Sequence, residues 1–123
     1  SGDKNINESI AKNRNIDFYC NRDNNVMIDK VTFIELFEQK YNCDRDNMVY
    51  MGDDNFDINI LKNVGYAFCP EDAAFEVKKV AKVINAKGGE CCVDKLYETL
   101  LHLQLLEAPT LDKVLFLDQN ERF

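Results

Sequence analysis

Between Met48 and Asp57 a short apolar run ends at a glycine and is followed by three aspartates within five residues. Apolar runs with β-branched and aromatic members are typical of buried strands, and a glycine lets the chain turn sharply. We therefore predict a strand at Met48–Met51 that ends at an acidic loop, residues 52–57, which contains Asp53, Asp54 and Asp57. This loop would lie at the carboxyl end of a strand, the edge at which open α/β sheets bind ligands.

The acidic loop has two interpretations. Carboxylates packed this closely repel one another unless a cation or a proton lies among them. Mg²⁺ prefers hard oxygen ligands and usually takes one or two carboxylates together with several waters. Alternatively, Asp53, Asp54 and Asp57 cap the next helix, because aspartate is a good N-cap residue and is stabilised by the positive end of a helix. The rest of the chain favours the metal site.

Apolar spacing along the chain predicts an alternation of strands and helices. Strands are predicted at 16–20, 48–51, 66–70, 82–85 and 113–118, and helices at 29–41, 57–63, 72–80 and 92–106. Gly65 is interpreted as the C-terminal stop of the helix at 57–63. Strands that alternate with helices imply βαβ units, so the predicted fold class is α/β with a mainly parallel sheet.

Length and composition limit the domain organisation and the function. The 123 residues fit one domain, with 1–15 flexible or a partial helix, 16–107 the α/β domain and 108–123 a C-terminal strand or tail. A net charge of −7 argues against nucleic acid binding. Five cysteines without a CxxC motif argue against a disulfide framework or a zinc site. No apolar run is long enough to span a membrane, and we expect a cytoplasmic location.

Two further segments carry groups that suit a phosphate ligand. Lys30 opens the first long helix, and in a parallel sheet the preceding loop lies on the same edge as the acidic loop. A lysine there can pair with a carboxylate and a phosphate oxygen, although a solvated surface lysine is the common alternative. Gly88 and Gly89 precede a helix, where free N–H groups bind anions; a plain turn is the alternative.

Together these segments resemble the haloacid dehalogenase (HAD) superfamily. The resemblance is greatest to its capless 3-deoxy-D-manno-octulosonate 8-phosphate phosphatase-like branch, which includes the C-terminal domain of acylneuraminate cytidylyltransferases. It extends over roughly 16–106 and rests on an ordered series of motifs: Asp29-Lys30-Val31, Met51-Gly52-Asp53-Asp54-Asn55-Phe56-Asp57, Leu61-Lys62-Asn63-Val64-Gly65, Pro70-Glu71-Asp72-Ala73 and Lys87-Gly88-Gly89.

The resemblance implies a three-layer Rossmann-like fold and assigns roles to the site residues. Lys30 would hold the nucleophile and the phosphate, and Asp53 would bind Mg²⁺. Asp57 would support the metal and its waters, with Asp54 as an outer-shell partner. A divalent cation and a lysine offset charge on a transferring phosphoryl group. The implied substrate is a phosphorylated sugar acid or another small phosphomonoester, and the implied assembly is a homo-oligomer.

The resemblance covers only the C-terminal portion of the family pattern. The strand of the first motif, which ends in Asp-x-Asp and supplies the nucleophile, is absent before Ile16, and the strand of the second motif is also missing. The predicted fold is therefore incomplete. Lys113–Asp118 resembles a first-motif strand, with Asp118 at the position of the nucleophile and Asn120 at that of the general acid. A tail or linker is the alternative for this segment.

These observations lead to three hypotheses. The first is a HAD-type, Mg²⁺-dependent phosphatase domain that is present as a partial chain, whose nucleophile the parent protein or a partner chain supplies. The second is a non-catalytic oligomerisation domain of an acylneuraminate cytidylyltransferase. The third is a truncated fragment that would unfold with poor cooperativity. In each case the missing strands would leave open sheet edges, which tend to recruit partners.

Overall fold

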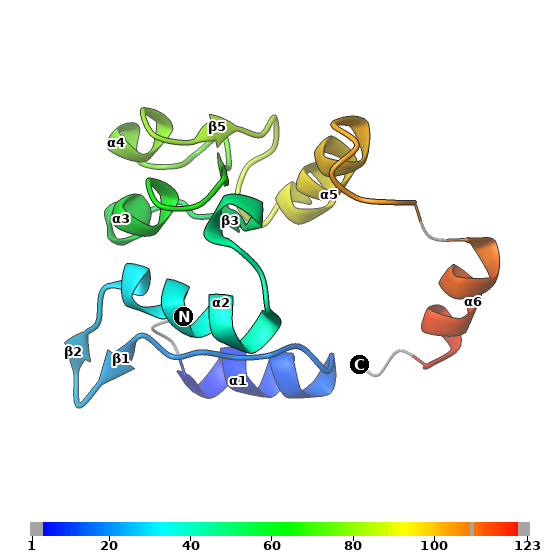
Figure 1. The fold of residues 1–123 in the computed structure, drawn as a ribbon, viewed down its shortest axis with the longest axis horizontal. Helices are drawn as coiled ribbons and strands as arrows, with labels where there is room; N and C mark the ends of the chain where they lie inside the picture. The colour runs from blue at the N-terminus through cyan, green and yellow to red at the C-terminus, as the bar shows by residue number, and fades with distance from the viewer. Residues whose placement is uncertain (1–3, 109, 121–123) are drawn as a thin grey trace. The chain divides into compact units, whose positions relative to one another are not determined.

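The computed structural model of the chain describes residues 4–108 and 110–120. They fall into two compact units, one formed by the described residues up to Ile28 and from Glu107 onward, and the other by Asp29–Leu106. The elements of the second unit, which carries the acidic loop, are η1 (Lys30–Phe33), α2 (Ile34–Tyr41), η2 (Arg45–Asn47), β3 (Val49–Met51), η3 (Asn55–Asp57), α3 (Ile58–Leu61), β4 (Tyr66–Cys69), α4 (Phe75–Lys78), β5 (Lys82–Val83) and α5 (Cys92–His102) (Figure 1).

A parallel sheet of three strands forms the centre of the second unit. The strand order is β3-β4-β5, and both neighbouring pairs are parallel. Tyr50 of β3 lies opposite Ala67 of β4, and Cys69 of β4 lies opposite Val83 of β5. The predicted α/β class with a mainly parallel sheet is therefore confirmed, and three of the predicted strands are present in shortened form.

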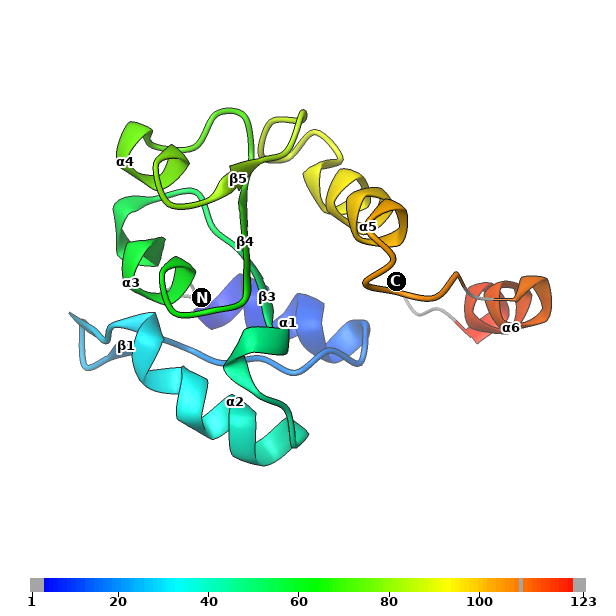
Figure 2. The same ribbon diagram turned by 45° about the horizontal axis from the view of Figure 1, so that its top comes forward.

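Helices pack on both faces of this sheet because successive side chains of β4 point to opposite sides. One face carries a core cluster with α3 and α4, and the other carries a cluster with α5, so the unit has three layers (Figure 2). The first cluster contains Leu61, Cys69, Ala73 and Val77, against which Tyr50 and Ala67 pack. The second contains Phe68, Ile84 and Leu100, against which Met51, Tyr66 and Leu96 pack.

The helix predicted at 29–41 is present, but its first turn is a 3₁₀ turn. The side chain of Asp29 accepts a hydrogen bond of 3.1 Å from the Val31 N–H and so caps η1. The α-helix then continues to Tyr41 and ends at Asn42, which adopts the left-handed conformation. This cap fixes the start of the segment and therefore the position of Lys30.

Gly65 is needed for a reason other than the predicted helix stop. Helix α3 already ends at Leu61, and Gly65 is not among the residues with positive φ. Its N–H donates a 2.9 Å hydrogen bond to the carbonyl of Arg45, and a Cβ at this position would overlap the backbone carbonyl of Asp46. The glycine therefore permits close approach of two backbone segments just before β4.

We expect Gly65→Ala to destabilise the chain by about 1–3 kcal/mol, because the added methyl group must displace backbone atoms. The change in the free energy of unfolding can be measured by urea denaturation. Gly88→Ala is the matched control, since its Cβ would lie 3.5 Å from the nearest side-chain atom, Asp72 Oδ1. The control should stay within about 1 kcal/mol of wild type. Equal stabilities of the two variants would contradict this account of Gly65.

In the first unit, a helix, α1 (Lys4–Asn13), lies within the N-terminal segment, whereas the strand predicted at 16–20 is wrong. The segment forms no ladder, and Ile16 is 61% exposed. A short antiparallel hairpin follows instead, β1 (Arg22–Asp23) and β2 (Val26–Met27). The two residues between them, Asn24 and Asn25, both have positive φ, as the type I′ turn of a two-residue hairpin requires.

The strand predicted at 113–118 is also wrong, because α6 (Leu111–Asn120) is a helix. The Thr110 hydroxyl accepts a hydrogen bond from the Lys113 N–H at 3.4 Å, which is the spacing of an N-cap residue. Leucine, lysine and glutamine in the segment favour helix. A short apolar run that pairs with no strand lacks the cross-strand contacts that stabilise extended backbone.

Within the described residues, no helix has both the length and the apolar character needed to cross a bilayer.

Candidate metal centre

The acidic loop begins where β3 ends. The Gly52 N–H donates to the Phe68 carbonyl at 3.2 Å, after which the chain leaves the sheet. Asp54 caps η3, since its side chain accepts from the Phe56 N–H at 2.8 Å. The Asp57 side chain reciprocally accepts from the Asp54 N–H at 3.2 Å. The helix-cap interpretation of the loop is therefore correct for Asp54 and Asp57, and it does not exclude a metal site.

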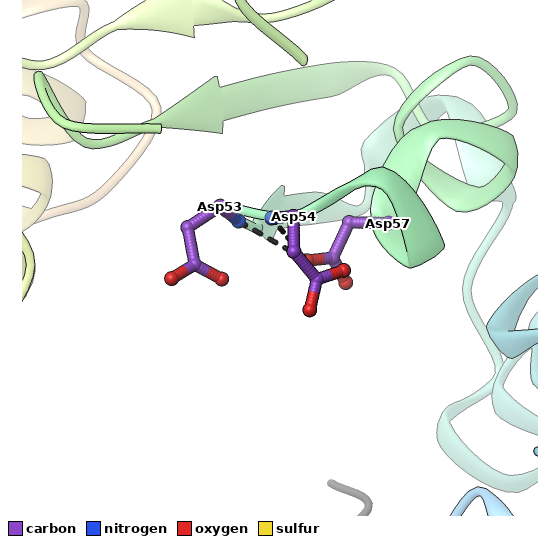
Figure 3. A group of neighbouring side chains, drawn as sticks. All are labelled: Asp53, Asp54 and Asp57. Carbon is purple, nitrogen blue, oxygen red and sulfur yellow. Dashed lines mark hydrogen bonds between the residues drawn. The ribbon is translucent and has the colours of Figure 1, made fainter. Parts of the chain in front are cut away.

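Asp57 is the buried centre of the loop, with only 2% of its surface exposed. Its Oδ1 accepts hydrogen bonds from Lys30 Nζ at 2.6 Å and from the Tyr50 hydroxyl at 2.8 Å. Its Oδ2 accepts from the backbone N–H groups of Asp53 at 3.1 Å and Asp54 at 3.2 Å (Figure 3). Since a carboxylate offers about four acceptor sites, protein donors already use this group fully.

These contacts determine the protonation states of the Asp57 carboxyl group and the Tyr50 hydroxyl group. Burial raises the pKa of Asp57, but the hydrogen bonds from Lys30 and Tyr50, with the Asp54 N–H, outweigh it and hold the pKa below its usual value. Burial, followed by the hydrogen bond to Asp57, raises the pKa of Tyr50. Asp57 is therefore ionised at neutral pH, and the tyrosine hydroxyl remains protonated and able to donate.

Gly52 makes room for the Asp57 carboxylate. A Cβ at Gly52 would overlap the carboxyl group of Asp57, so any other residue here would displace it. The loop is also tied to the start of α4, because the Ala74 N–H donates to the Asp53 carbonyl at 2.8 Å. The backbone at the start of the acidic loop is thus tied both to β4 and to the start of α4, as a preorganised binding site requires.

The donor set fits a hard divalent cation. Asp53 and Asp54 are exposed, whereas Asp57 is buried, and one carboxylate oxygen from each lies within 4.8 Å of the others. Figure 3 shows the Asp53 and Asp54 side chains projecting from the loop on the same side as the Asp57 carboxylate. Because both oxygens of Asp57 already accept hydrogen bonds, the available ligand atoms come from Asp53 and Asp54, and Asp57 holds the loop that carries them.

Lys30 reaches the acidic loop, as the sequence predicts from its place at the start of a helix. Its ion pair with Asp57 has an N–O distance of 2.6 Å, and its side chain is 20% exposed. Asp57 is its hydrogen-bond partner among the described residues. An ammonium group has three donors, so a bound anion can use the others.

Two other predicted site segments are arranged differently. The Gly88 N–H donates to Asp72 Oδ1 at 2.7 Å, so this amide is engaged within the protein. Gly89 has a φ of 77°, a conformation that favours glycine, and its role in phosphate binding stays a prediction. Asp118 lies on α6, so the strand on which its nucleophile role depended is absent. Its side chain lies outside the described residues.

Tyr50 is a site residue that the sequence reasoning missed. It lies in the apolar run of β3, where the pattern indicates only a buried strand. The available signal was its polar hydroxyl: a tyrosine within a buried strand normally has a hydrogen-bond partner. The acidic loop that follows the same strand contains carboxylate acceptors a few residues away in the sequence.

A family model for haloacid dehalogenase-like hydrolases matches residues 4–90. The chain belongs to this family. The match includes Lys30 and the whole acidic loop. The family match and the three-layer parallel fold support the resemblance at the level of HAD-like hydrolases. The specific branch and the restriction to the C-terminal part of the family pattern stay predictions.

Solved structures support the same fold. A hypothetical protein from Xanthomonas campestris is 22% identical with a TM-score of 0.70, over 80% of this chain and 52% of that one. The cobalt-bound deoxy-D-mannose-octulosonate 8-phosphate phosphatase from Haemophilus influenzae is 18% identical with a TM-score of 0.77, over 98% of this chain and 68% of that one. The chain thus spans about half the length of the Xanthomonas protein and two thirds of the Haemophilus enzyme.

Proposed function

We propose that this chain provides the metal-binding part of a divalent-cation-dependent phosphatase that acts on small phosphomonoesters. The observation that carries the proposal is that the loop backbone and the Lys30 ammonium group both bind the buried carboxylate of Asp57. Asp57 fixes the backbone of the loop that presents Asp53 and Asp54, and it also fixes the ammonium group of Lys30. Exposed carboxylates beside an anchored lysine provide groups that bind a cation and a phosphate next to each other.

Each residue contributes a defined interaction to this site. Asp53 would hold the cation, here proposed to be Mg²⁺, with Asp54 beside it through a direct or water-mediated contact. When bound, the ion would offset negative charge on the phosphoryl oxygens. Lys30 would donate to a phosphate oxygen while its ion pair with Asp57 keeps it in place. Asp57 would remain hydrogen-bonded to protein donors throughout.

The proposed substrate class is a phosphorylated sugar acid. Support comes from the Haemophilus influenzae enzyme, which is named for an eight-carbon sugar acid phosphate and was solved with cobalt bound. Its fold agrees with that of this chain over almost the whole length. The resemblance to the octulosonate phosphatase-like branch, which rests on the ordered motifs from Asp29 to Gly89, supports the same class.

The nucleophile would come from a strand added beside β3. Among the described residues β3 pairs only with β4, so its other edge is open. A parallel strand at this edge would end next to the acidic loop, since the carboxyl ends of parallel strands lie together. A carboxylate at its end could attack phosphorus and form an aspartyl-phosphate while the P–O bond to the substrate's alcohol breaks, the departing oxygen taking up a proton; water would then hydrolyse the aspartyl-phosphate to release phosphate. A longer form of the protein or a neighbouring copy in a homo-oligomer would supply this strand.

The proposal is tested by measuring phosphate release from a panel of sugar-acid phosphates and from p-nitrophenyl phosphate. The assay uses the chain and any longer natural form of it, with Mg²⁺ or with excess EDTA. We expect hydrolysis with Mg²⁺ and a loss of at least about 100-fold on chelation, because the cation offsets phosphoryl charge. Hydrolysis that continues unchanged in EDTA, or no hydrolysis by any form, would contradict the proposal.

A further inference from the structure

We infer that Tyr50 is a positioning residue for the metal loop: its hydroxyl fixes the Asp57 carboxylate, and through it the loop that presents Asp53 and Asp54. The inference rests on the proposed function and adds a residue that neither the acidic motif nor the lysine motif contains. Its direct observation is the 2.8 Å hydrogen bond from the Tyr50 hydroxyl to Asp57 Oδ1.

Tyr50 is held by the sheet and not by the loop. Its backbone pairs with Ala67 in the parallel ladder between β3 and β4. Its ring packs against the core cluster that contains Leu61 and Val77. A tyrosine ring has only two rotatable side-chain bonds, so a packed ring places its hydroxyl with little freedom. The position of this hydroxyl is therefore determined by the rigid core of the unit.

The two donors on Asp57 Oδ1 differ in rigidity. Lys30 reaches this oxygen at 2.6 Å through a long, partly exposed side chain, whereas Tyr50 reaches it from the packed sheet. If a bound phosphate draws the ammonium group toward itself, the tyrosine hydroxyl keeps the carboxylate in place. The anchored lysine can then respond to a ligand without loss of the loop geometry.

The other oxygen of Asp57 carries this constraint to the metal ligands. Oδ2 accepts from the N–H groups of Asp53 and Asp54, the two residues with available carboxylates. Rotation of the Asp57 carboxylate would break both hydrogen bonds. The path from Tyr50 to the proposed ligand Asp53 therefore contains two hydrogen bonds. Partners bonded directly to metal ligands commonly change metal affinity by about 10–100-fold when mutated, and Tyr50 lies one hydrogen bond beyond such a partner, so an effect at the lower end of that range is expected.

Tyr50→Phe separates this role from simple core packing. The substitution removes one hydroxyl and leaves the ring in the cluster of Leu61 and Val77. Tyr66→Phe is the matched control, because Tyr66 lies on the adjoining strand and packs against the core cluster of Phe68 and Leu100 on the opposite face of the sheet. Three quantities are measured: the Mn²⁺ dissociation constant by calorimetry, the ¹³C shift of the Asp57 carboxyl carbon without metal, and amide exchange at Asp53 and Asp54.

We expect Tyr50→Phe to weaken Mn²⁺ binding about tenfold, to shift the Asp57 carboxyl resonance and to speed exchange of the two loop amides relative to the other core amides. Tyr66→Phe should leave all three unchanged. The inference is overturned if Tyr50→Phe binds Mn²⁺ like wild type and leaves the loop amides protected, or if exchange accelerates uniformly. A wild-type chain that binds no Mn²⁺ would defeat the proposed function, while a selective loss of protection at the loop amides would still support the role of Tyr50.

Discussion

Replacement of Asp53 by asparagine should weaken Mg²⁺ and Mn²⁺ binding by roughly two orders of magnitude, since ligand charge strongly affects affinity for hard cations. The side chain of Asp53 is exposed, and it does not cap η3, which is the role of Asp54. The substitution keeps the shape of the side chain and the backbone N–H that donates to Asp57. The expected effect is therefore a loss of cation affinity with little change in folding. Isothermal titration calorimetry measures the affinity directly.

Asp94→Asn is the control for the change of net charge. Asp94 is an exposed acidic residue in the first turn of α5 and lies outside the acidic loop. This variant should bind both ions like wild type, and both variants should keep the wild-type midpoint in urea within a few tenths of a molar unit. If Asp53→Asn bound Mn²⁺ with wild-type affinity, the assignment of Asp53 as a ligand would be wrong.

Lys30→Met should have the largest effect on stability. It leaves the buried Asp57 without its cation, and removing one partner of a buried ion pair typically costs about 3–5 kcal/mol. The hydrogen bonds from Tyr50 and from the two loop amides remain, and Lys30 is 20% exposed. Both facts place the expected loss near the lower end of that range. The free energy of unfolding from urea denaturation tests this.

Lys79→Met is the matched control, because Lys79 also pairs with a carboxylate, that of Glu76, at 2.9 Å. Both members of that pair are more than half exposed, at 52% and 57%. Exposed pairs contribute no more than about 1 kcal/mol, so this variant should be close to wild type. If Lys30→Met and Lys79→Met lowered the free energy of unfolding equally, the view that the buried Asp57 carboxylate depends on Lys30 would be contradicted.

The sequence was sufficient to predict the sheet of the second unit because local and long-range signals agree there. Met48–Met51 and Tyr66–Pro70 are apolar runs bounded by glycine or proline, and each becomes a paired, parallel strand in β3 and β4. The intervening helical patterns are amphipathic and cover the sheet. Where the pattern, the boundary residues and the available partners favour the same structure, the prediction from sequence is confirmed.

Two strand predictions failed where the partner was missing. The segments at 16–20 and 113–118 have the apolar composition of strands, but neither forms a ladder within the described residues. A strand is stabilised by cross-strand pairs, which a single sequence does not reveal. The second segment is also preceded by a helix-start signal, Thr110, whose hydroxyl accepts from the Lys113 N–H and which outweighs the apolar run.

The composition of the site was more predictable than its internal geometry. Motif spacing was enough to place Lys30 near Asp57, since both lie at the same edge of the sheet. The direction in which the Asp57 carboxylate points depends on packing around Gly52 and on the tyrosine hydroxyl. Such contacts between residues of different elements depend on strand register and side-chain rotamers, which the motif spacing does not specify.

The most direct test of the central claim, that the acidic loop binds a divalent cation, is anomalous diffraction from crystals grown with Mn²⁺. We predict one strong anomalous peak at coordination distance from an Asp53 carboxylate oxygen, with Asp57 still hydrogen-bonded to Lys30 and Tyr50. An acidic loop without an anomalous peak at saturating Mn²⁺, or a peak coordinated only by residues outside it, would contradict this claim.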